Sequence, residues 1–205
     1  MTQPNKWFVA PQIKPEADTR IFLFPYAGGG PSVFSNWSIE LSNNLETQIA
    51  HYPGRGSRYN ESPIKSLTTL IKELTQAIQP LLDKPFLFFG HSLGGVIVVQ
   101  ALPGYTSATP LEANVVAAPL AGMPLLEKAC AFRGVTPGPW PGAVTLTQWR
   151  TRKNLDGAFR SLAADPQDVA LPAVKVVRLP ESYRGHRLGH NWSVSWVADE
   201  LAATR

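Results

Sequence analysis

The chain has 205 residues, of which 44% are hydrophobic and 17% are charged, and this composition favours one globular domain over residues 1–205. The net charge of +4 is spread along the sequence without a long basic run, which argues against a nucleic-acid-binding protein. The single cysteine excludes an intramolecular disulfide, and no apolar stretch reaches the roughly 18 residues of a membrane span. We therefore expect a cytoplasmic protein without a membrane span.

Short, largely apolar runs predict the strands of the N-terminal half. They are RIFLF at 20–24, TQIAHY at 47–52 and PFLFFG at 85–90. Runs of this kind are typical of strands that are buried on both faces of a parallel sheet. Between the second and third runs, apolar residues recur at spacings of three and four, which predicts a helix over about 62–81 with Ser62 as its cap.

The C-terminal half contains weaker signals of the same type. Further strands are predicted at 114–118, 143–149 and 173–179, and an amphipathic helix at 192–204 closes the chain. The segment between the first two of these strands, 119–142, is rich in proline. Alternating strands and helices predict an α/β fold with a mostly parallel sheet that is covered on both faces.

The motif Gly-x-Ser-x-Gly occurs where a predicted strand meets a predicted helix. Ser92 lies between Gly90 and Gly94, directly after the strand at 85–90 and before the apolar residues 93–102. A serine on such a strand–turn–helix junction is exposed to substrate and lies at a helix N-terminus, where free N–H groups can face a developing anion. A purely structural turn would explain the glycines but not this setting. The motif therefore indicates a nucleophile.

A glycine-rich loop, FPYAGGG at 24–30, follows the first predicted strand. In an acyl-transfer site, one oxyanion donor is the backbone N–H of the residue after the nucleophile, here Leu93. The second donor is expected in the loop after an early strand, within 26–28. A phosphate-binding loop is the alternative, but the GxxxxGK[ST] spacing and its lysine are absent.

Three stretches together resemble the type II thioesterases that accompany non-ribosomal peptide and polyketide synthetases. They are FLFPYAGGGPSVFSNW, YPGRGSRYNES and FGHSLGG, and the resemblance covers about residues 20–102. It implies the α/β-hydrolase fold, Ser92 as the nucleophile, and the N–H groups of Ala27 and Leu93 as the oxyanion donors. Arg55, in the second stretch, is interpreted as a residue of the pocket rim or as structural.

The catalytic base is expected after the last strand, because the chain order in α/β-hydrolases is serine, acid, histidine. His51 precedes the serine and His91 is part of the motif, so His186 and His190 remain. The family has a Gly-His pair just past its final strand, and the pair that ends in His186 fits this position. His190 also follows a glycine but lies almost against the last helix. We therefore favour His186.

The acid is expected after the strand at 143–149, since no carboxylate directly follows the strand at 114–118. Asp156 is the first carboxylate there and is our choice. Asp165 and Asp168 follow it, and each of the three also suits a turn or a helix cap.

The resemblance implies hydrolysis of acyl or aminoacyl thioesters carried on phosphopantetheinyl carrier proteins, through a Ser-His-Asp triad. It implies neither a cofactor nor a metal ion, and we expect a monomer. The proline-rich region 119–142 predicts a lid that is shorter than in the family, which would leave the site more open. One alternative is a small-ester esterase or acyltransferase with the same nucleophile, and another is a decayed hydrolase that only binds carrier proteins.

Overall fold

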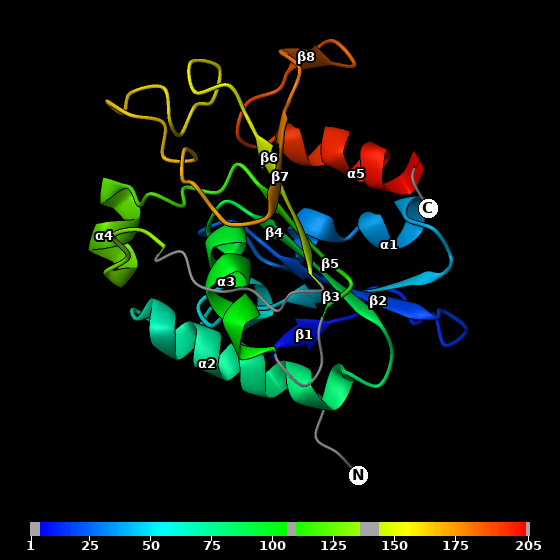
Figure 1. Cartoon of the computed structure of the whole chain (residues 1–205). Coiled ribbons are helices and arrows are strands. Elements are labelled where there is room, and N and C mark those ends of the chain that lie inside the picture. Colours follow the sequence, from blue (N-terminus) through cyan, green and yellow to red (C-terminus); the bar gives the residue numbers. More distant parts are fainter. Residues whose placement is uncertain (1–4, 106–109, 136–143, 204–205) are drawn as a thin grey trace.

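The computed structural model describes residues 5–105, 110–135 and 144–203. Seven strands form one sheet in the order β1-β3-β2-β4-β5-β6-β7, and of the strands in these ranges only β1 pairs antiparallel within it (Figure 1). The strands are β1 Phe8–Val9, β2 Thr19–Phe24, β3 Leu45–Ala50, β4 Phe86–His91, β5 Glu112–Val116, β6 Thr145–Arg150 and β7 Val174–Arg178. The predicted mostly parallel sheet is confirmed.

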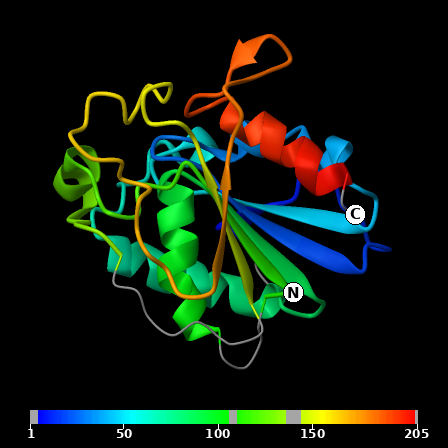
Figure 2. The same cartoon turned by 45° about the horizontal axis from the view of Figure 1, so that its top comes forward.

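Helices lie on both faces of this sheet (Figures 1 and 2). Helices α2 (Leu67–Ile78), α3 (Leu93–Ala101) and α4 (Pro124–Cys130) lie on one side, and α1 (Trp37–Glu40) and α5 (Ser193–Ala203) lie on the other. Single 3₁₀ turns lie at Pro31–Phe34, Gly56–Arg58, Gln79–Leu81 and Leu102–Gly104. The described helices include none that is long and apolar enough to cross a membrane.

The central strand β4 shows why the sheet needs helices on both sides. Phe86 and Phe88 pack with α2 and α3, and the alternate residues Leu87 and Phe89 pack with α1 and α5. All four are at least 97% buried. Side chains alternate between the two faces of a strand, and burying each large apolar side chain contributes about 1.5–3 kcal/mol. An uninterrupted apolar run therefore produces two apolar faces.

Helix α2 begins later than the sequence predicts. Its first residue is Leu67, and the Oγ of Ser66 accepts a hydrogen bond of 3.3 Å from the N–H of Thr69, so Ser66 is the cap. Residues 62–66 precede the helix as a loop, in which Ile64 and Lys65 line a pocket. The predicted start at Ser62 is wrong because both serines suit a cap, and only Ser66 precedes the apolar face of the helix.

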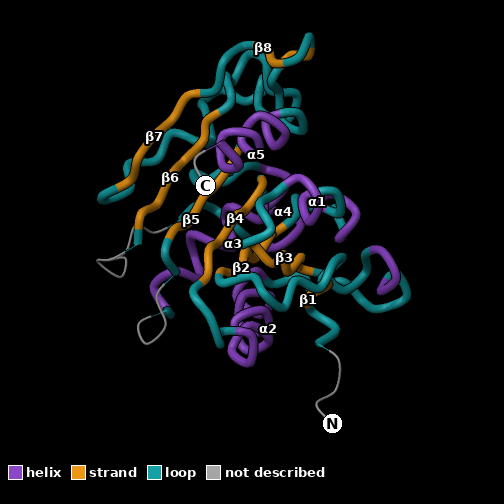
Figure 3. The backbone as a smooth tube through the Cα atoms, turned by 90° about the vertical axis from the view of Figure 1, so that its right-hand side faces the viewer, coloured by secondary structure: helices purple, strands orange, loops and turns teal. Residues whose placement is uncertain are grey.

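The sheet ends at β7, which lies at its outer edge (Figure 3). The connection between β6 and β7, residues 151–173, contains turns but no helix. Val176 of β7 is consequently 47% exposed. A small hairpin of β8 (Ser182–Tyr183) and β9 (His186–Arg187) then projects from this end of the molecule (Figure 1).

The segment after β5 folds back on itself around α4. The N–H of Val135 donates a hydrogen bond of 2.7 Å to the carbonyl of Leu120, which closes the loop. Leu126 on α4 is buried and belongs to the core beside α3. Of the predicted lid region 119–142, residues 136–142 lie outside the part of the chain that the structure describes.

Candidate active site

Ser92 occupies a strained turn at the carboxyl end of β4. Its backbone angles are φ 55° and ψ −116°, outside the regions that a non-glycine residue normally adopts. Its N–H donates a hydrogen bond of 2.9 Å to the carbonyl of Val116, which ties the turn to the end of β5. Such strain persists only where the surroundings hold it, and it is characteristic of a nucleophile elbow.

The glycines on either side of Ser92 are required by close backbone approaches. A Cβ on Gly90 would lie 2.3 Å from the carbonyl oxygen of Gly94, and a Cβ on Gly94 would lie 1.9 Å from that of Phe24. The elbow is therefore possible only with glycine at these two positions. This packing confirms the reason for the motif and places Leu93, the next residue, at the first position of α3.

Gly94→Ala is expected to lower the free energy of unfolding by about 3 kcal/mol, because backbone on both sides prevents relief of the overlap. Urea denaturation followed by circular dichroism measures this. Gly104→Ala is the matched control, since a Cβ on Gly104 would meet no atom within 4 Å. Equal midpoints for the two variants would show that the elbow is less tightly packed than described.

His190 and Asp156 are joined by a hydrogen bond of 3.1 Å between Nδ1 and Oδ2. The carboxylate of Asp156 is fully buried and also accepts hydrogen bonds from the hydroxyl of Thr151 (2.6 Å) and the N–H of Ala158 (2.9 Å). A carboxylate accepts hydrogen bonds, so Nδ1 of His190 donates and Nε2 is left free to accept a proton. The ring of Phe159 packs edge-on against the imidazole with centroids 4.9 Å apart.

The histidine in contact with Asp156 is thus His190, and this differs from the sequence expectation. His186 is exposed on the projecting hairpin, where its ring stacks on Trp192 with centroids 3.8 Å apart. Arg184 and Gly185 both have positive φ, which is typical of a tight hairpin turn. The Gly-His pair at 185–186 therefore marks this turn rather than the loop that faces the acid.

Both histidines follow a glycine, and the packing around that glycine distinguishes His190 from His186. A Cβ on Gly189 would lie 2.8 Å from the carbonyl oxygen of Leu155, the residue that precedes Asp156. A Cβ on Gly185 would meet nothing within 4 Å. Gly189 therefore lets the histidine loop approach the acid loop, and this contact between segments distant in the sequence cannot be read from local pattern.

The two other candidate acids contact residues other than histidine. Oδ1 of Asp165 accepts hydrogen bonds from the N–H and the side-chain amide of Gln167, at 3.0 and 3.1 Å. Asp168 forms an ion pair of 2.9 Å with Arg150 and is largely exposed. Asp156, favoured from the sequence, is the one of the three that contacts a histidine.

The imidazole of His190 lies beside the elbow. Its centroid is 5.1 Å from that of His91, the residue directly before Ser92. Among the described residues no hydrogen bond joins Oγ of Ser92 to His190. Catalytic hydrogen bonds often form or shorten only when substrate binds.

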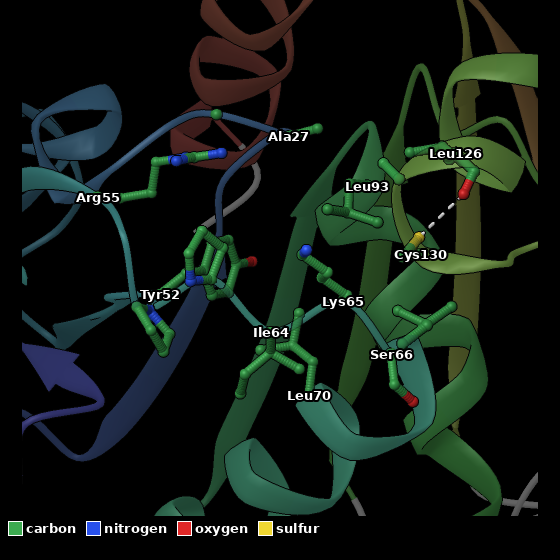
Figure 4. A pocket seen from close by; sticks show the side chains of 15 residues that line it. Ala27, Tyr52, Arg55, Ile64, Lys65, Ser66, Leu70, Leu93, Leu126 and Cys130 are labelled. Carbon is green, nitrogen blue, oxygen red and sulfur yellow. Dashed lines mark hydrogen bonds between the residues drawn. The ribbon is translucent and has the colours of Figure 1, made fainter. Parts of the chain in front are cut away.

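Ala27 and Leu93, the two predicted oxyanion donors, border the same pocket of about 290 Å³ (Figure 4). The N–H of Leu93 belongs to the first turn of α3, whose amides have no acceptor within the helix. The other pocket walls are mostly apolar and include Tyr52, Pro53, Pro63, Ile64, Leu67, Leu70, Leu126 and Ala129. Arg55 and Lys65 add two basic side chains to this lining.

Two polar groups in the pocket walls are unsuited to ionise. Burial raises the pKa of the Tyr52 phenol far above its usual value, and its hydroxyl donates to the carbonyl of Pro25 at 3.3 Å. Burial also raises the pKa of the Cys130 thiol, whose Sγ donates to the carbonyl of Leu126 at 3.2 Å. Both side chains therefore act as neutral wall residues, and the described residues contain no cluster of three metal-ligating side chains.

In comparison with known families, the N-terminal half is similar to thioesterases. Residues 19–101 match the family model of the thioesterase domain. The gramicidin S biosynthesis protein GrsT of Aneurinibacillus migulanus is 40% identical over 97 residues, which are 47% of this chain and 38% of that protein. The medium-chain S-acyl fatty acid synthase thioesterase of Homo sapiens is 38% identical over 91 residues, which are 44% of this chain and 34% of that protein. The match thus spans less than two fifths of either relative, and the expected resemblance over about residues 20–102 is confirmed.

Comparison with solved structures extends over the whole fold. The type II thioesterase BorB from the borrelidin biosynthetic cluster superimposes with a TM-score of 0.74, at 14% sequence identity, over 100% of this chain and 98% of that one. The chain therefore has the α/β-hydrolase fold that the resemblance implied, including its C-terminal half.

Proposed function

We propose that this protein is a serine thioesterase that hydrolyses acyl or aminoacyl thioesters from phosphopantetheinyl carrier proteins. The observation that carries the proposal is the pairing of His190 with the buried Asp156 beside the strained Ser92 elbow. The match of residues 19–101 to the thioesterase domain supports the same chemistry. In this proposal the triad is Ser92, His190 and Asp156, with His190 in place of His186.

The proposed reaction proceeds through an acyl-enzyme. Oγ of Ser92 attacks the thioester carbonyl while Nε2 of His190 takes its proton, and the carboxylate of Asp156 stabilises the imidazolium. The N–H groups of Ala27 and Leu93 stabilise the oxyanion. His190 then gives the proton to the departing thiolate, and it later activates the water that releases the acid from Ser92.

The pocket supports an apolar acyl group as the substrate. It begins between Ala27 and Leu93, where the oxyanion would form, and continues along walls from the loop before α2 and from α4 (Figure 4). An apolar acyl chain replaces water along these walls, which stabilises the complex by about 25 cal/mol per Å² buried. Leu126 on α4 lies opposite Ile64 and Leu70, so it narrows the pocket from the lid side.

We propose a carrier protein as the partner on the basis of the biosynthetic pathways to which similar proteins belong. GrsT is a gramicidin S biosynthesis protein, and BorB is a type II thioesterase from the borrelidin biosynthetic cluster. Basic side chains in the pocket lining, Arg55 and Lys65, together with the net charge of +4, suit an acidic partner. We propose that the protein is a cytoplasmic monomer and that its chain forms a single domain. We also propose that the loop around α4 is a reduced lid over the active site.

An esterase acting on small free esters is the second candidate, and the short segment around α4 favours it. The proposed thioesterase is expected to hydrolyse an octanoyl thioester on a carrier protein with a kcat/KM at least about 10-fold above that for p-nitrophenyl octanoate, because the carrier adds binding energy remote from the reacting bond. Turnover of the free ester alone would identify the esterase. A fluorophosphonate probe that fails to label the folded protein would contradict both and favour a binding protein.

A further inference from the structure

His91, the variable residue of the Gly-x-Ser-x-Gly motif, is tied to the catalytic histidine loop. Its side chain is 99% buried, and its Nε2 lies 2.8 Å from the carbonyl oxygen of His190. A carbonyl oxygen only accepts hydrogen bonds, so Nε2 of His91 carries the proton and donates. The end of β4 therefore supplies both the nucleophile and, one residue earlier, a contact to the backbone of His190.

A second donor, from the last helix, reaches the same carbonyl. The hydroxyl of Ser193, which is fully buried at the start of α5, donates a hydrogen bond of 2.7 Å to the carbonyl of His190. The N–H of Ser193 in turn donates to the carbonyl of Gly189 at 3.1 Å. The backbone of His190 is thus held between the sheet and the last helix.

The contact made by Nε2 of His91 leaves the other ring nitrogen, Nδ1, without a hydrogen bond. With Nε2 protonated, Nδ1 is an acceptor, and within the described residues this buried atom has no hydrogen-bond partner. An unsatisfied buried polar atom destabilises a fold, and an apolar residue at this position would avoid that cost. The presence of a histidine here is explained if the bond from Nε2 has a role beyond stability.

The surroundings also keep His91 neutral. Burial, together with the charge of His190 when it is protonated, lowers the pKa of His91 to about 3. His91 therefore does not compete for the proton that His190 takes from Ser92. It remains a donor of fixed geometry throughout the reaction.

We propose that His91 and Ser193 are positioning residues that clamp the carbonyl of His190 and so hold its imidazole at the elbow. The proposal rests on the proposed function, because it assigns a role relative to Ser92 and His190. Without the clamp, the hydrogen bond to Asp156 would restrain only Nδ1, and Nε2 would shift away from the elbow as the backbone of His190 moved. A displacement of about 1 Å in a catalytic group lowers a rate by about 100-fold.

Two substitutions of His91 separate the clamp from simple packing. The side-chain amide nitrogen of glutamine lies as many bonds from Cβ as Nε2 of histidine, whereas that of asparagine falls short. His91→Gln is expected to retain kcat within about 3-fold, and His91→Asn is expected to lower kcat by at least about 10-fold with KM nearly unchanged. Ser193→Ala is expected to lower kcat similarly, with the exposed Ser195→Ala as its control.

The position of the imidazole is measured independently by proton NMR. The Nδ1 proton that His190 shares with Asp156 gives a downfield resonance, which is expected to persist in His91→Gln and to broaden or disappear in His91→Asn. Equal kcat and equal spectra for the two variants would overturn the clamp, with urea midpoints showing that both are folded. Absence of turnover in the wild-type protein would overturn the proposed function. The NMR spectra would still test the clamp in that case, because they do not depend on activity.

Discussion

Replacement of His190 by alanine is expected to lower kcat for thioester hydrolysis by at least about 10⁴-fold, because the serine then has no group to take its proton. His186→Ala is expected to change kcat by less than about 2-fold, since His186 is exposed and contacts Trp192 instead of the acid. Steady-state hydrolysis of an acyl carrier substrate measures both. Labelling by a fluorophosphonate probe reports the same difference at the first step.

The two variants form a matched pair, because each removes an imidazole from the same C-terminal segment. His186→Ala loses a ring stack on the surface, and its effect on stability is expected to stay near 0.5 kcal/mol. Circular dichroism spectra of both variants check that the fold is retained. A large loss of kcat in His186→Ala with normal kcat in His190→Ala would reverse the assignment of the base.

Asp156→Asn is expected to lower kcat by about 10³- to 10⁴-fold while leaving KM nearly unchanged. Asparagine has nearly the same shape and can still accept from the N–H of Ala158, so the loop is retained. Its neutral amide cannot stabilise the imidazolium of His190. An amide N–H facing Nδ1 also favours the tautomer with the proton on Nε2, which cannot accept from Ser92. The measurement is kcat and KM for an acyl thioester.

Asp168→Asn is the control for that substitution. Asp168 pairs with Arg150 but is largely exposed, so its contribution to stability is at most about 1 kcal/mol and kcat is expected to change by less than about 2-fold. Equal losses of kcat in Asp156→Asn and Asp168→Asn would indicate a general effect of charge near the site. In that case the specific role of Asp156 would be contradicted.

Local pattern was sufficient for the features that depend on short stretches. The apolar run of β4 requires two covered faces, and the elbow glycines Gly90 and Gly94 are required within a few residues of Ser92. The nucleophile and the parallel sheet therefore follow directly from the sequence. Asp156 could be ranked first because it is the first carboxylate after β6.

The base could not be found in this way, because its position depends on contacts between distant segments. Two glycine–histidine pairs follow β7, and both suit a turn. The close approach of Gly189 to the carbonyl of Leu155 separates them, and it joins residues more than thirty positions apart. The start of α2 cannot be predicted for a related reason, since Ser62 and Ser66 are equally good caps in isolation.

The position of part of the site at the edge of the sheet determines how local unfolding would affect the site. Ser92 follows the central strand β4, but Asp156 follows β6 and His190 follows β7, where the sheet ends and side chains such as Val176 are exposed. Regions with little buried apolar surface open locally at lower free energy than the core, in units that precede global unfolding. The base thus depends on β7, the least buried strand of this sheet, so partial opening of the edge separates His190 from an acid and a nucleophile that are still folded.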